Sequence, residues 1–106
     1  MIYNLDLNHD EIVTAFETLG CIVIDNAKTK RYEPGQLDLW VGLPNPYGGL
    51  AVWVWVEVKT STGALRAEQK KTIADCKEAG LPVEVIRSTA DIEAMYHKYL
   101  GLMRDV

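Results

Sequence analysis

One segment of this sequence restricts the possible folds more than any other, the run from Leu50 to Lys59. Its strand-forming residues are Val52, Trp53, Val54, Trp55, Val56 and Val58. Side chains alternate between the two faces of a strand, and here both faces are apolar. Strands of this kind lie inside sheets that are covered on both sides. The run therefore predicts a central strand in a sheet with helices on both faces.

The segments around this strand show helical and strand patterns with short polar connections between them. Apolar residues recur at helical spacing from Ile12 to Leu19. They predict a first helix that begins after Asn8 or Asp10 and ends at Gly20. In chain order, the remaining expected elements are strands at 21–24, 37–41 and 50–59, a helix at 65–79, a strand at 82–86 and a helix at 89–100.

The order of these elements predicts the topology. Short loops link the first three strands, which we expect to pair as an antiparallel meander. The fourth strand follows a helix, so we expect it to pair in parallel through a crossover. The expected fold is α/β (α+β), with a mixed four-stranded sheet flanked by helices. Because 106 residues are too few for two independent cores, we expect one domain over 1–106.

Composition and charge exclude several classes of protein. Eleven Lys and Arg stand against 15 Asp and Glu, and the net charge of −4 argues against a protein that holds nucleic acid by bulk charge. The longest apolar run, 50–56, is far shorter than the roughly 20 residues of a membrane-spanning helix. The N-terminus lacks a signal-peptide pattern, and Cys21 and Cys76 have no metal-site spacing. We expect a cytoplasmic protein with reduced thiols that are buried or half-buried, and no membrane association.

Charged residues at the end of the central strand point to chemistry. Glu57 and Lys59 share one face of the strand, while Val58 faces the other way. Asp38 lies between two leucines in the strand that a meander places alongside. Two carboxylates and the carbonyl of Val58 offer the hard oxygen ligands that Mg²⁺ or Mn²⁺ prefers. The alternative is a strand that simply ends in polar residues at the surface.

A lysine beside such a site can take part in catalysis. The Lys59 ammonium group would orient or deprotonate an attacking water, or stabilise charge that develops on a phosphate. Two basic clusters are candidates for nucleic-acid contact, although either one can also be an ordinary solvated surface. They are Lys28, Lys30 and Arg31, and Arg66, Lys70 and Lys71.

Two tryptophans share the face of the central strand that carries Glu57. Trp53 and Trp55 precede Glu57 by four and two residues. They have two possible roles, stacking on nucleic-acid bases or packing in the core under the first helix. The pattern favours the core.

The arrangement of Asp38 before Glu57-Val58-Lys59 resembles the signature of the PD-(D/E)xK nuclease superfamily, and the element order resembles its restriction-endonuclease-like αβββαβ core. A closer resemblance is to the VRR-NUC (virus-type replication-repair nuclease) domain. The matching residues are Gly35-Gln36-Leu37-Asp38-Leu39, Trp55 to Thr60, Gly63, Leu65, Gln69, Gly80 and Val85-Ile86-Arg87-Ser88. Leu37 stands where the family usually has proline, a position that is not a metal ligand.

The resemblance assigns roles to particular residues. It implies that Asp38 and Glu57 are metal ligands, that Val58 contributes its carbonyl and that Lys59 is the catalytic lysine. Gln69 matches a glutamine of the family that hydrogen-bonds in or beside the site, or else it is an ordinary polar position on a helix. The family also places an acidic residue on the first helix. Glu11 is the preferred candidate for this further metal ligand, and Glu17 is the alternative.

The resemblance implies a Mg²⁺- or Mn²⁺-dependent DNA endonuclease, with stand-alone members that resemble Holliday-junction resolvases of phages and bacteria. The alternatives are an inactive nucleic-acid-binding module and a nuclease for flaps, ends or RNA. Small size and negative charge favour a homodimer on branched DNA, because pairing doubles the basic clusters. The candidate interfaces are the loop around Tyr47 and Leu50 and the final helix with Met95, Tyr99 and Met103.

Overall fold

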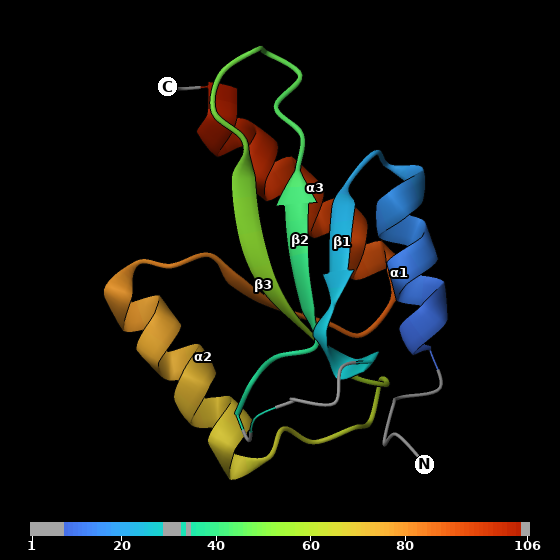
Figure 1. Ribbon diagram of the computed structural model, residues 1–106, viewed down its shortest axis with the longest axis vertical. Coiled ribbons are helices and arrows are strands. Elements are labelled where there is room, and N and C mark those ends of the chain that lie inside the picture. The colour runs from blue at the N-terminus through green and yellow to red at the C-terminus, as the bar shows by residue number, and fades with distance from the viewer. Residues whose placement is uncertain (1–7, 29–32, 34, 105–106) are drawn as a thin grey trace.

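The computed structural model describes residues 8–28, 33 and 35–104, which form three α-helices and a four-stranded sheet (Figure 1). The elements are α1 (His9–Thr18), β1 (Ile22–Asp25), the 3₁₀ turn η1 (Asn26–Lys28), β2 (Leu39–Leu43), β3 (Val52–Val58), α2 (Ala67–Ala79), β4 (Val83–Ile86) and α3 (Thr89–Arg104). Each predicted element is present, in the predicted order. The bounds differ by at most four residues, and the ends of α2 and β4 and the start of α3 are as predicted.

The sheet has the order β1-β2-β3-β4 and the predicted mixture of directions. β1, β2 and β3 form an antiparallel meander, and β4 runs parallel to β3 after the crossover through α2. The register pairs Leu39 with Val56 and Val41 with Val54. This register fixes which side chains of neighbouring strands share a face, and it brings the start of β2 to the end of β3.

One face of the sheet carries the larger core. Leu39 and Val54 point into it, and Ile12 and Phe16 of α1 pack against them, all almost fully buried. α3 crosses behind the strands in Figure 1 and adds an apolar stripe to the same core. The residues of that stripe are Ile92, Met95, Tyr99 and Met103. The prediction that Met95, Tyr99 and Met103 form a subunit interface is therefore wrong, because their side chains fill the core.

The second face is covered by α2, over the end of the sheet formed by β3 and β4. Leu37, Ile73, Cys76 and Val83 make a small apolar cluster there. Cys76 and Cys21 are both buried free thiols, as predicted. Within the described residues, no helix has the length and apolar character needed to cross a membrane.

Among the described residues, no helix lies over the part of this second face formed by β1, β2 and the first half of β3. Trp53 of β3 lies there and is 46% exposed. The favoured prediction, that Trp53 and Trp55 pack in the core under the first helix, is wrong, because α1 packs on the opposite face. Trp55 is half-buried and packs against the α2 cluster instead. The central strand is thus covered on both sides only in its second half.

Candidate active site

The start of β2 and the end of β3 bring Asp38 and Glu57 together. Asp38 directly precedes β2, and its carboxylate Oδ2 accepts a hydrogen bond of 2.9 Å from the backbone N–H of Val58. Since Glu57 precedes Val58, the two carboxylates lie on neighbouring strand ends. Asp38 is 7% exposed and Glu57 is 1% exposed. Two buried carboxylates in one place are unfavourable unless they are paired or bind a cation.

Glu57 is held by two neighbours through the same oxygen. Gln69 Nε2 donates a 2.7 Å hydrogen bond to Glu57 Oε2, and the ammonium nitrogen of Lys59 lies 3.5 Å from that oxygen. The other oxygen, Oε1, is buried and has no hydrogen-bond partner among the described residues. The four predicted residues Asp38, Glu57, Lys59 and Gln69 are therefore gathered where β2 begins and β3 ends, and among the described residues Glu57 Oε1 has no hydrogen-bond partner.

Gln69 reaches Glu57 because of where α2 begins. Its Oε1 accepts a 2.9 Å hydrogen bond from the N–H of Arg66, which tethers the side chain to the first turn of the helix. The segment that leads to Asp38 packs against the same turn at Gly35. There φ is +83°, and an added Cβ would lie 3.0 Å from Thr72 Oγ1 and 3.2 Å from the Glu68 carbonyl. Only glycine fits this approach without strain.

Burial raises the pKa of Glu57 from its ordinary value of 4.5 to about 8. Loss of hydration is the largest cause, and the neighbouring negative charge of Asp38 adds to it. The Lys59 ammonium group acts in the opposite direction. At neutral pH the carboxyl group of Glu57 therefore holds a proton that a cation has to displace.

Two residues that were not predicted to lie at the site fix the end of β3. Asn8 Nδ2 lies 3.2 Å from the carbonyl oxygen of Lys59 and 3.1 Å from that of Arg87. Arg87 Nη1 in turn donates to the carbonyls of Thr60 and Gly63, at 2.8 and 2.7 Å. Together they hold the turn that directly follows Lys59. Asn8 was predicted only as a helix cap, and Arg87 only as part of a motif.

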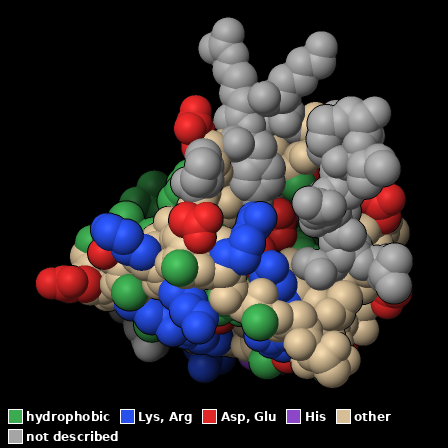
Figure 2. Space-filling model, turned by 90° about the horizontal axis from the view of Figure 1, so that it is seen from below, with side chains coloured by type: hydrophobic (Ala, Val, Ile, Leu, Met, Phe, Trp, Pro, Cys, Tyr) green, Lys and Arg blue, Asp and Glu red, His purple; other side chains and the backbone are tan. Residues whose placement is uncertain are grey.

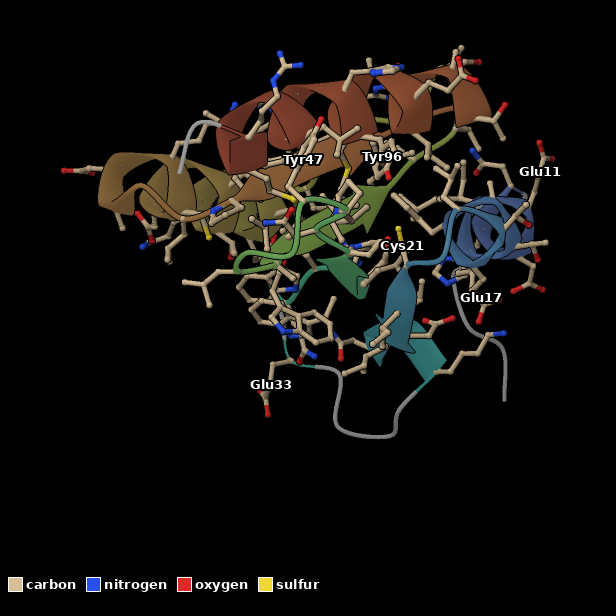
Figure 3. All side chains as sticks on the ribbon, turned by 90° about the horizontal axis from the view of Figure 1, so that it is seen from above. Glu11, Glu17, Cys21, Glu33, Tyr47 and Tyr96 are labelled. Atoms are coloured by element: carbon tan, nitrogen blue, oxygen red, sulfur yellow. The ribbon has the colours of Figure 1, made fainter. Side chains whose placement is uncertain are left out.

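Glu11 is not brought to this site. Both Glu11 and Glu17 are exposed, and Figure 3 shows them on the outer side of α1. In the part of the chain that the structure describes, no three His, Cys, Asp or Glu side chains are grouped as a metal site. The physical reason is the rotation of the helix, because burying Ile12 and Phe16 turns Glu11 outward. The predicted third acidic ligand from this helix is therefore not in place.

The residues of the two predicted basic clusters differ in whether they form ion pairs. Lys28 pairs with Asp10 at 3.1 Å and Lys71 with Asp75 at 2.8 Å, both exposed ion pairs that contribute little to stability. Arg66 and Lys70 are exposed and form no ion pair with the described residues. Lys30 and Arg31 lie outside the described residues. Lys and Arg side chains gather on the face seen in Figure 2, around several carboxylates.

The donor set fits a hard divalent cation. Carboxylate and carbonyl oxygens are the ligands that Mg²⁺ and Mn²⁺ prefer, and Glu57 Oε1 is a buried acceptor with no other partner among the described residues. A Mg²⁺ ion typically takes one or two carboxylates from the protein and keeps the rest of its positions for water and phosphate. Asp38, Glu57 and the carbonyl of Val58 can supply that number of ligands.

The raised pKa of Glu57 predicts how the stability of the metal-free protein depends on pH. Between pH 4.5 and 8 the unfolded chain has an ionised Glu57 while the folded chain keeps the proton. The folded state thus binds more protons, so the free energy of unfolding falls as pH rises through this window. The expected loss is on the order of 1 kcal/mol per pH unit, and it ends above pH 8.

Glu57→Gln removes this titration while keeping the shape of the side chain. In chelator, the difference in unfolding free energy between Glu57→Gln and the wild type should grow in favour of the variant from pH 5 to pH 8. Urea titrations of both proteins at several pH values measure it. Parallel pH profiles for the two proteins would contradict the assigned environment of Glu57.

Comparison with known families gives one match. A sequence model of the VRR-NUC domain matches residues 22–90, a range that runs from β1 to the start of α3. It includes Asp38, Glu57, Lys59 and Gln69. Searches of curated proteins and of solved structures give no match.

Proposed function

Because the chain belongs to the VRR-NUC family, whose domain is a nuclease domain of the PD-(D/E)xK type, we propose that it is a metal-dependent endonuclease that hydrolyses phosphodiester bonds in DNA. One observation carries this proposal. Asp38 and Glu57 are buried side by side at two strand ends, and the Lys59 ammonium group lies 3.5 Å from the Glu57 carboxylate. A surface strand end would leave these groups in water.

The side chains of the site have separate tasks in this proposal. Asp38, Glu57 and the Val58 carbonyl hold Mg²⁺ or Mn²⁺, which when bound supplies positive charge for the phosphate and lowers the pKa of a water molecule. Lys59 orients the attacking water or carries positive charge to the phosphate. Gln69 keeps the Glu57 carboxylate in one orientation through its 2.7 Å hydrogen bond. The raised pKa of Glu57 means that a proton leaves when a cation binds at neutral pH.

DNA reaches the site through the basic residues around it. Arg66 is the residue that precedes α2, and Lys70 lies one residue after the Gln69 that contacts Glu57. Both are exposed, so they are the first candidates for phosphate contact. Lys28 and Lys71 would exchange their weak surface partners for phosphate. Phosphate contact by Lys30 and Arg31 stays a prediction.

The substrate proposed is branched DNA, and the active form proposed is a homodimer. One copy has a radius of gyration of 13.7 Å and a net charge of −4, so it covers little duplex and attracts it weakly. Two copies related by a two-fold axis match the approximate symmetry of a four-way junction. The loop at 44–51 is the remaining candidate interface. Leu50 is 85% and Tyr47 is 56% exposed.

Two other functions have less support. An inactive binding module would not need Asp38, Glu57 and Lys59 together, and all three are present. A nuclease for flaps, ends or RNA would use the same site, so only the substrate distinguishes it. A role in DNA repair or phage replication, in the cytoplasm of a bacterial or phage-infected cell, stays a prediction.

A cleavage assay combined with a mass measurement tests substrate and assembly together. The protein is incubated with linear, nicked, flapped and four-way DNA of the same sequence, in Mg²⁺, Mn²⁺ or chelator. We expect cleavage only with a cation and fastest on the four-way substrate, and light scattering at micromolar protein should give the mass of a dimer. A monomer without preference for the junction would contradict the proposals of branched DNA as substrate and of a dimer. A lack of cleavage on all of these DNA substrates would contradict the proposal that the protein is a DNA endonuclease.

A further inference from the structure

The uncovered part of the sheet carries large apolar side chains in one patch. β1 contributes Ile22 and Ile24, which are 64% and 51% exposed, and Trp40 and Trp53 of the next two strands are 37% and 46% exposed. The register pairs Ile24 with Trp40, so these residues share one face. We call these four residues the open apolar face. Leaving such a surface in water is unfavourable, and a patch of this kind commonly marks a binding site.

Trp53 lies flat on the sheet. A Cβ added at Gly42, its cross-strand partner, would lie 3.1, 3.2 and 3.4 Å from three consecutive carbon atoms of the Trp53 six-membered ring. If the edge of the ring pointed at Gly42, the middle one of these three atoms would be clearly closer than the other two. The three distances are instead nearly equal. The indole therefore rests one face on the glycine backbone, and it is 46% exposed. Its opposite face is available to a planar ligand.

The open apolar face adjoins the half of β3 that leads to the active site. Trp40 stacks on Trp55 with ring centroids 5.0 Å apart and an angle of 6° between the planes. Trp55 lies two residues before Glu57 on the same face of β3. Trp53 is four residues before Glu57, which is about 13 Å along an extended strand. This distance corresponds to roughly four stacked bases.

The size of the open apolar face favours a small flat ligand over a second protein chain. Counting about 200 Å² for each fully exposed side chain, the exposed fractions of its four residues correspond to roughly 400 Å². A stable protein interface takes about 800 Å² from each partner. Single bases need much less area, and an exposed indole face binds any of them by stacking.

We infer that the open apolar face is a stacking site for the unpaired bases of a DNA strand that enters the active site. The inference rests on the proposed nuclease function for its choice of ligand. A single strand next to the cleavage position places a base on Trp53, and its backbone continues beside Trp55 toward the end of β3, where the buried Glu57 contacts Gln69 of α2. In fully paired DNA the bases are stacked inside the duplex, so none of them can stack on Trp53. The substrates favoured by this site are therefore those with an unpaired segment beside the duplex.

Binding of a fluorescent thymidine oligonucleotide by the metal-free protein tests the inference without cleavage. In chelator, Trp53→Leu keeps apolar area but removes the flat ring, and we expect binding to weaken about tenfold or more. Trp53→Phe keeps a smaller ring and should retain most of the affinity. Wild-type tryptophan fluorescence should be quenched by the oligonucleotide, and Trp53→Phe should show much less quenching.

Two further variants act as controls on this result. Gly42→Ala changes no exposed side chain but pushes the Trp53 ring from its position, so it should weaken oligonucleotide binding as well. Leu102→Ala removes a 58% exposed apolar side chain of α3, on the other side of the molecule, and should leave binding unchanged. Thermal melting of each variant checks that the fold is retained.

The outcomes separate this inference from the nuclease proposal. Equal oligonucleotide binding by Trp53→Leu and wild type would overturn the stacking site, even if the protein cleaves DNA. Trp53-dependent binding by a protein that cleaves nothing would support the stacking site and contradict the nuclease. A wild-type dimer that becomes monomeric in Trp53→Leu, with no oligonucleotide binding in either protein, would show that a second copy occupies this face and would overturn the inference.

Discussion

Replacing Asp38 by Asn is expected to reduce Mg²⁺-dependent DNA cleavage by roughly 10³-fold or more, because a lost cation ligand removes several kcal/mol of transition-state stabilisation. The fold should survive the change, since the amide oxygen of Asn can still accept the 2.9 Å hydrogen bond from the Val58 N–H. Removing the negative charge of Asp38 also removes one of the causes that raise the pKa of Glu57. Initial cleavage rates at saturating Mg²⁺ measure the effect.

Asp75→Asn is the matched control for this variant. Asp75 is exposed on α2 and pairs with Lys71, so the same chemical change there should leave the cleavage rate within a factor of two or so. Cleavage by Asp38→Asn at a rate close to that of Asp75→Asn would mean that Asp38 is not a ligand of the catalytic cation.

Lys59→Ala is expected to separate catalysis from cation binding. Its ammonium group acts on water or phosphate and not on the cation, so turnover should fall by roughly 10² to 10⁴-fold, while calorimetric binding of Mn²⁺ remains. Lys59→Arg should not restore full activity, because the guanidinium group is bulkier and cannot lose a proton at neutral pH. The measurement is the cleavage rate together with the Mn²⁺ affinity of each variant.

The control for the lysine variant is Lys98→Ala. Lys98 is exposed on α3, where it pairs with Glu84 at 2.7 Å, so its loss should change neither quantity. If Lys59→Ala cleaves as fast as Lys98→Ala, the catalytic role of Lys59 is contradicted, and the proposed cation site is not affected by that result.

The sheet and the pair of carboxylates could be predicted because they depend on local patterns. Alternation along a strand places Glu57 and Lys59 on one face, and short loops make neighbours of the strands that carry Asp38 and Glu57. The family match over residues 22–90 agrees with the resemblance seen in the motifs. The antiparallel order of β1, β2 and β3 follows from their connections without a helix, and the parallel direction of β4 follows from the crossover through α2.

Two features could not be predicted: the area of the sheet that each helix covers, and the rotation of each helix about its own axis. Trp53 belongs to a strand that is apolar on both faces, yet α2 covers only the half of that face near β4. An apolar stripe such as Met95, Tyr99 and Met103 has the same sequence pattern whether it packs on its own sheet or on a partner. The outward turn of Glu11 follows from the burial of Ile12, which sequence alone does not quantify.

Long-range hydrogen bonds from side chains to the backbone are a second class of feature that could not be predicted from the sequence. Asn8 reaches carbonyl groups 51 and 79 residues away. Arg87 reaches carbonyl groups 27 and 24 residues away. Such contacts have no periodicity and no spacing rule, so only the folded chain identifies the residues that hold the turn after Lys59.

Calorimetric titration of Mn²⁺ into the metal-free protein at neutral pH tests most directly whether Asp38 and Glu57 hold the catalytic cation. Repeating the titration in buffers of different ionisation enthalpy counts the protons released. The expected result is saturable binding with release of about one proton, because Glu57 has a pKa of about 8 before the cation arrives, and loss of binding in the double variant Asp38→Ala, Glu57→Gln. Unchanged Mn²⁺ binding by the double variant would show that Asp38 and Glu57 do not hold the cation.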